Sequence, residues 1–121
     1  MPIRQLKTYT AQTGYVYQYY LVGQRPALED DLEAPATEYV FDVTADRKTT
    51  FAVSVFLQPD AVSAWSSRHS RELSEPEQYA AAKLRLMQAF DEIVDMLNEG
   101  RRLRLDAELL ASLLESIGVE D

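Results

Sequence analysis

Hydrophobic and polar residues alternate in three segments of the first half of the chain. These segments are residues 15–23, 37–44 and 50–57. In each of them the odd-numbered positions are the more apolar, as Tyr39, Phe41 and Val43 illustrate. Successive side chains of a strand point to opposite faces of a sheet, so this period of two indicates strands with one buried face. The alternation is weak around residues 3–9, so the sequence leaves open whether this segment is a fourth, short strand.

The second and third segments are expected to form a hairpin. Directly opposed residues of an antiparallel pair point to the same face, so an inward side chain must face another inward side chain. We therefore expect Phe41 opposite Val53. The same register places Val43 opposite Phe51, and it centres the turn on residues 46–48.

The second half of the chain has the features of three helices. Pro59 suits the first turn of a helix, where its missing N–H has no partner. Ser74 and Glu77 have the spacing of a capping box, which predicts a second helix that runs to Gly100. Asp106 then caps a last helix rich in leucine.

Strands followed by helices predict an α+β fold rather than alternating βαβ units. We expect a three- or four-stranded antiparallel meander followed by three helices packed on one face of the sheet. A chain of 121 residues fits a single domain, residues 1–121, with the sheet in 1–58 and the helices in 59–121.

Apolar and charged residues alternate in residues 101–105, which are expected to be a linker or an edge strand. The most deeply buried side chains are expected to be Phe41, Val53, Val55, Phe90 and Leu113.

Charge and composition exclude several classes of function. The chain has 20 acidic and 12 basic side chains and a net charge of −8, so phosphate backbones and anionic lipid surfaces would repel it. We expect neither a nucleic acid nor a membrane as a partner. The chain has no cysteine, and its beginning lacks the apolar run of a signal peptide. A cytoplasmic location is therefore expected.

The sequence gives no catalytic residue that we can assign. The single histidine, His69, has only Ser66 on its side of a helix, and it is expected to pack beside Trp65. One histidine and no cysteine predict no metal site, and the absence of a glycine-rich loop predicts no nucleotide cofactor. A small-ligand site or a simple active site is the alternative hypothesis, in a crevice between sheet and helix near Trp65, Arg68 and His69.

The even-numbered face of the predicted sheet is the candidate interface. It combines polar residues with apolar ones, and large apolar patches on soluble domains tend to be contact surfaces. The residues assigned to this interface are Val16, Tyr20, Val22, Val40 and Phe56. The alternative is that a helix folds over this face.

The long connection at residues 24–36 is expected to be mobile or to dock a partner. The favoured function is a non-enzymatic interaction or accessory protein, acting as a homo-oligomer, most simply a homodimer, or on a protein partner.

Overall fold

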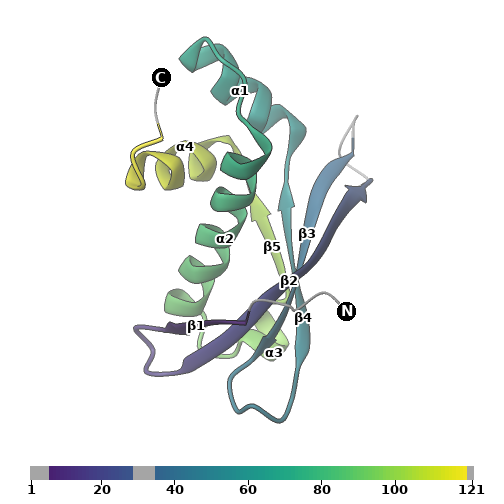
Figure 1. Cartoon of the computed structure of the whole chain (residues 1–121), viewed down its shortest axis with the longest axis vertical. Coiled ribbons are helices and arrows are strands. Elements are labelled where there is room, and N and C mark those ends of the chain that lie inside the picture. Colours follow the sequence, from purple (N-terminus) through teal and green to yellow (C-terminus); the bar gives the residue numbers. More distant parts are fainter. Residues whose placement is uncertain (1–5, 29–34, 120–121) are drawn as a thin grey trace.

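The computed structural model describes residues 6–28 and 35–119. In this part of the chain it is an α+β structure with a mixed sheet of five strands and four helices. The strands are β1 (Lys7–Thr10), β2 (Val16–Ala27), β3 (Ala36–Thr44), β4 (Phe51–Leu57) and β5 (Arg102–Leu105), and the helices are α1 (Pro59–His69), α2 (Glu75–Glu92), α3 (Met96–Glu99) and α4 (Ala107–Ser116). Helices α1, α2 and α4 lie on one side of the sheet (Figure 1).

The strands follow one another across the sheet in the order of the sequence. β1 to β4 form an antiparallel meander, which confirms the predicted meander in its four-stranded form. β5 lies beside β4 and runs parallel to it, so the predicted purely antiparallel sheet is wrong at this edge. A parallel neighbour requires a long crossover connection, and here that connection contains α1, α2 and α3. Of the two alternatives for residues 101–105, the edge strand is confirmed.

The predicted register of the hairpin between β3 and β4 is confirmed, with Phe41 opposite Val53. The turn between them is held by the side chain of Asp46. Its carboxylate accepts a hydrogen bond from the backbone N–H of Lys48 at 2.8 Å. Arg47 has a φ of 65°, a left-handed conformation that such turns often contain.

A β-bulge interrupts the pairing of β2 with β3. Leu21 lies opposite Phe41, whereas Gly23 lies opposite Val40, so Val22 is an extra residue on β2. A bulge places two residues of one strand against one residue of its neighbour, and the alternation of side chains changes phase there. The odd-numbered positions of β2 therefore face the helices before the bulge and the other side of the sheet after it.

β2 continues beyond the bulge to Ala27, so the first residues of the predicted 24–36 connection are strand and not loop. Arg25 lies opposite Glu38 in this extension. The acidic part of the predicted connection, residues 29–34, lies outside the described residues.

The core lies between the sheet and the helices. Four of the five side chains expected to be most buried are 0 % exposed, namely Phe41, Val53, Val55 and Phe90. The expectation for Leu113 is wrong, because this side chain is only partly buried while Leu110 and Leu114 on the same helix are 0 % exposed. Tyr15 comes before β2 and is 46 % exposed, so the inward odd positions of this strand begin at Tyr17.

The predicted capping box at the start of α2 is confirmed, since Ser74 accepts from Glu77 N–H and the Glu77 carboxylate accepts from Ser74 N–H. The predicted end of this helix is wrong. α2 ends at Glu92, Ile93 takes an extended conformation, and Asp95 caps the separate one-turn helix α3. This break is why the described chain has four helices where the sequence predicted three.

Candidate functional site

The sheet has one face without helices, and this open face carries the predicted interface residues. Val16 and Val22 are 47 % and 45 % exposed. Tyr20 and Val40 are half-buried. In the described part of the chain α1, α2 and α4 lie on the opposite face (Figure 1), so these three helices do not cover the four side chains.

Phe56 differs from the other predicted interface residues because it is 3 % exposed. The guanidinium carbon of Arg102 lies 4.5 Å from the centre of its ring. This distance is typical of a cation–π contact, and the arginine covers the ring on the open face. Phe56 is therefore already buried within the chain, and Arg102 lies over the position where the sequence predicted an apolar contact.

Glu38 lies beside Phe56 on the same face and is the buried charged residue of the described chain, with 7 % exposure. Its carboxylate accepts from Arg25 Nε at 2.8 Å and from the Ser54 hydroxyl at 2.6 Å. The hydrogen bond from Arg25 lowers the pKa of Glu38, although burial of the carboxylate opposes this effect. The bulge in β2 makes this pair possible, because it turns Arg25 towards the open face.

A second polar pair lies further along the open face, where the Tyr20 hydroxyl donates to the Asp42 carboxylate at 2.7 Å. The open face is therefore a mixture of exposed valines and fixed polar pairs.

The second predicted site, at Trp65, Arg68 and His69, lies on α1. The ring of His69 stacks on that of Trp65, with 4.2 Å between their centres, so the predicted packing of these two residues is confirmed. The Arg71 guanidinium carbon lies 4.8 Å from the Trp65 ring centre. Arg68 is exposed and borders a different hollow together with the edge of Trp65.

That hollow has a volume of about 300 Å³ and lies between α1 and α4. It is lined by Ala64, Trp65, Arg68, Ala107, Glu108 and Ala111. The sequence predicted a crevice between sheet and helix, whereas this hollow lies between two helices. It brings Trp65 and Arg68 together and leaves out His69.

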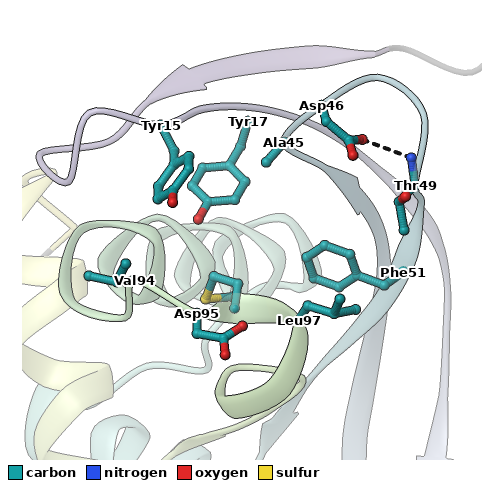
Figure 2. A pocket seen from close by; sticks show the side chains of 10 residues that line it. Tyr15, Tyr17, Ala45, Asp46, Thr49, Phe51, Val94, Asp95 and Leu97 are labelled. Carbon is teal, nitrogen blue, oxygen red and sulfur yellow. Dashed lines mark hydrogen bonds between the residues drawn. The ribbon is translucent and has the colours of Figure 1, made fainter.

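A third site was not predicted, and it is a pocket of about 300 Å³ at the turn between β3 and β4. We call it the hairpin pocket. It is lined by Tyr15, Tyr17, Ala45, Asp46, Thr49, Phe51, Val94, Asp95, Met96 and Leu97. Figure 2 shows Tyr15 and Tyr17 on one side, with their hydroxyls pointing towards the segment around Asp95, and Phe51 and Leu97 on the other side.

The break between α2 and α3 forms one wall of the hairpin pocket. Because Ile93 is extended, the chain leaves the helix axis, and Val94 becomes 62 % exposed at the rim. Leu97 and Tyr15 are also large exposed apolar residues, at 43 % and 46 %. The rim of the pocket is therefore unusually apolar for a protein surface.

The polar side-chain groups of the hairpin pocket are two carboxylates, two tyrosine hydroxyls and the hydroxyl of Thr49. Asp46 accepts from the backbone N–H of Thr49 at 2.8 Å, and this bond and a similar one from Lys48 lower its pKa. Asp95 accepts from the backbone N–H of Asn98 at 3.3 Å. Burial raises the pKa of Tyr17, and the nearby Tyr15 and Asp95 add to the effect.

One feature of the sequence indicates this pocket in retrospect. Asp95 is a strong N-cap residue inside what otherwise looks like a helix, and Asn98 three positions later can bond back to it. A cap within a helical pattern predicts a break, and a break turns nearby apolar side chains away from the core. The contribution of Tyr15 and of the β3–β4 turn depends on tertiary structure and has no such local signal.

Within residues 6–28 and 35–119, no three acidic or histidine side chains are grouped closely enough to hold a metal ion. None of the helices in the same part of the chain has the length and apolar character that a membrane crossing requires. Comparison of the chain with protein-family models, with curated proteins and with solved structures finds no match.

Proposed function

We propose that this chain is a non-enzymatic interaction protein that associates with a second copy of itself through the open face of its sheet. The observation that supports this proposal is the one-sided packing of the helices, which leaves exposed valines on the opposite face (Figure 1). The proposal includes a cytoplasmic location. It includes neither a nucleic acid nor a membrane as a partner, because the net charge of −8 opposes binding to anionic surfaces.

The composition of the open face favours association over permanent exposure to water. A sheet face in water normally presents polar side chains at every second position. Here Val16, Val22 and Val40 interrupt that pattern, and removing them from water would be favourable. Arg25 and Glu38 already form an ion pair within the chain. Burying the two charges together in an interface therefore costs less than burying either charge without its partner. A two-fold dimer is the simplest closed assembly for such a face.

Sedimentation equilibrium of the wild type and of two single variants tests the proposal. Val16→Glu and Val22→Glu place a charge at exposed positions, so the subunit should fold normally while the contact is lost. Ile117→Glu is the matched control, because Ile117 is also 47 % exposed but lies at the end of α4. We expect a dimer for the wild type and the control, and monomers for the two valine variants. A monomeric wild type, or valine variants that remain dimeric, would contradict the proposal.

The hollow between α1 and α4 supports a second candidate function, a small-ligand-binding protein or a simple enzyme at Trp65 and Arg68. The supporting observation is that the exposed residue Arg68 and the aromatic residue Trp65 line the same hollow. Trp65 is the single tryptophan of the chain, so tryptophan fluorescence, excited at a wavelength that tyrosine does not absorb, reports on the surroundings of this one residue. A ligand that changes this fluorescence without changing the mass of the assembly would favour the second candidate.

A further inference from the structure

The hairpin pocket combines aromatic walls with an apolar floor. The rings of Tyr15 and Tyr17 border one side and the ring of Phe51 the other (Figure 2), while Met96 and Leu97 contribute apolar atoms. The faces of aromatic rings carry partial negative charge and attract cations. At about 300 Å³ the pocket is at the small end of ligand sites, so it suits a ligand with few heavy atoms.

The charged residues that line the pocket are all acidic. Asp46 comes from the β3–β4 turn and Asp95 from the start of α3, and no lysine, arginine or histidine is among the ten described residues of its lining. Both carboxylates cap backbone N–H groups, which are neutral donors. A carboxylate has about four acceptor positions, so each of them can still accept a further hydrogen bond.

We propose that the hairpin pocket binds a small organic cation, an alkylammonium or arylammonium ion. The apolar body of the ligand lies between Tyr15, Phe51 and Leu97, and its ammonium group lies on the Asp95 side of the pocket. An anion would be repelled by the two carboxylates, and a neutral apolar molecule would gain no charge–charge attraction from them. This site is separate from the open face of the sheet.

Three ligands of equal chain length and different charge test the proposal. We would titrate the isotope-labelled wild-type protein with hexylamine, hexanol and hexanoate and follow the backbone amide signals by NMR. Hexylamine should shift the signals of Tyr17, Thr49 and Leu97 in a saturable way and bind at least about threefold more tightly than hexanol, a difference typical of exposed charge contacts. Hexanoate should bind most weakly. Equal binding of the three ligands, tighter binding of hexanoate, or no saturable shifts for hexylamine would overturn the proposal.

Two capping residues provide a matched pair of variants. Asp95→Asn removes one of the two negative charges of the pocket and keeps the cap, because asparagine caps a helix about as well as aspartate. Asp106→Asn makes the same change at the cap of α4, outside the pocket. Asp95→Asn should weaken hexylamine binding about twofold to fivefold and leave hexanol binding unchanged. Asp106→Asn should change neither. Unchanged hexylamine binding by Asp95→Asn, with amide signals elsewhere intact, would overturn the assignment.

A third variant tests whether the ligand occupies the pocket itself. Leu97→Lys places a cation at an exposed rim position, so the fold should be retained while hexylamine binding is lost. Val16→Glu, on the open face, should keep wild-type hexylamine binding whether or not it changes the assembly. Hexylamine binding that survives Leu97→Lys would place the ligand elsewhere and overturn the proposal.

Discussion

The ring of Phe90 on α2 stacks on the ring of Tyr17 on β2, with 4.1 Å between their centres and 7° between their planes. The rings of Tyr9 and Tyr19 each lie 6.0 Å from Phe90. One helical side chain therefore contacts aromatic residues on both β1 and β2. This cluster fixes α2 on the sheet and supports the Tyr17 side of the hairpin pocket.

Phe90→Ala should lower the free energy of unfolding by about 3–5 kcal/mol, because it removes a fully buried ring that its neighbours cannot replace. Urea titration of both proteins measures this loss. Val94→Ala, at a position that is 62 % exposed, should change stability by no more than about 0.5 kcal/mol. A loss below about 1 kcal/mol for Phe90→Ala would show that this ring is not a core contact.

Glu77 should make the stability of the chain depend on pH. Its carboxylate accepts from Arg71 Nη2 at 2.8 Å and from the Ser74 N–H at 2.9 Å, and these bonds, that from Arg71 foremost, lower its pKa from 4.5 to about 2. The pKa is lower in the folded chain, so the contribution to stability is present above about pH 4.5 and is lost as the pH falls towards about 2.

The comparison of wild type with Glu77→Gln measures this contribution. Wild type should be the more stable protein at neutral pH, and the difference should shrink steadily between about pH 4.5 and about pH 2. Glu75→Gln, an exposed change in the same helical turn, serves as the control and should give a smaller difference. A difference between wild type and Glu77→Gln that does not vary over this range would contradict the prediction.

Gly100→Ala should destabilise the chain through contact with one side chain. A Cβ at this position would overlap the sulfur of Met96 and lie 3.3 Å from Met96 Cα, while the backbone itself has a negative φ that alanine adopts readily. Overpacking of this kind typically costs about 1–3 kcal/mol. In a Met96→Ala background the same change should cost less, because the overlapping sulfur is gone. Equal costs in the two backgrounds, measured by urea titration, would exclude the overlap as the cause.

The parts of the fold that local rules determine could be predicted from the sequence. The capping box of Ser74 and Glu77 depends on four consecutive residues, and the register of β3 against β4 depends on the parity of a short hairpin. Both are confirmed. The buried positions of Phe41 and Phe90 followed from the same periodic patterns.

Other parts of the fold depend on competition between signals or on distant contacts. The apolar spacing through Val94 and Leu97 predicts a continuous helix, but the cap at Asp95 ends it, and both side chains are exposed as a result. The bulge at Val22 has one local signal, the adjacent Gly23, but a glycine within a strand does not by itself determine how the register shifts. The covering of Phe56 by Arg102 depends on β5 lying beside β4, which parity within the hairpins does not predict.

The hairpin pocket could not be predicted because three separate segments form it. Tyr15 precedes β2, Asp46 belongs to the turn after β3, and Asp95 lies at the break between α2 and α3. Each of these residues has an ordinary local role in the sequence, as a turn or cap residue. Their convergence depends on where the helix break places α3 against the turn.

The pairing of β5 with β4 joins segments that lie far apart in the sequence, as Ser54 opposite Arg102 illustrates. The other three strand pairs join neighbours in the sequence. Contacts between distant segments form slowly, because closing the long intervening loop costs conformational entropy before the contacts can contribute favourable free energy. We therefore expect the meander to assemble first and β5 to complete the sheet last. Until residues 102–105 are in place, β4 is an open edge, and the nascent chain is most prone to aggregation during that interval.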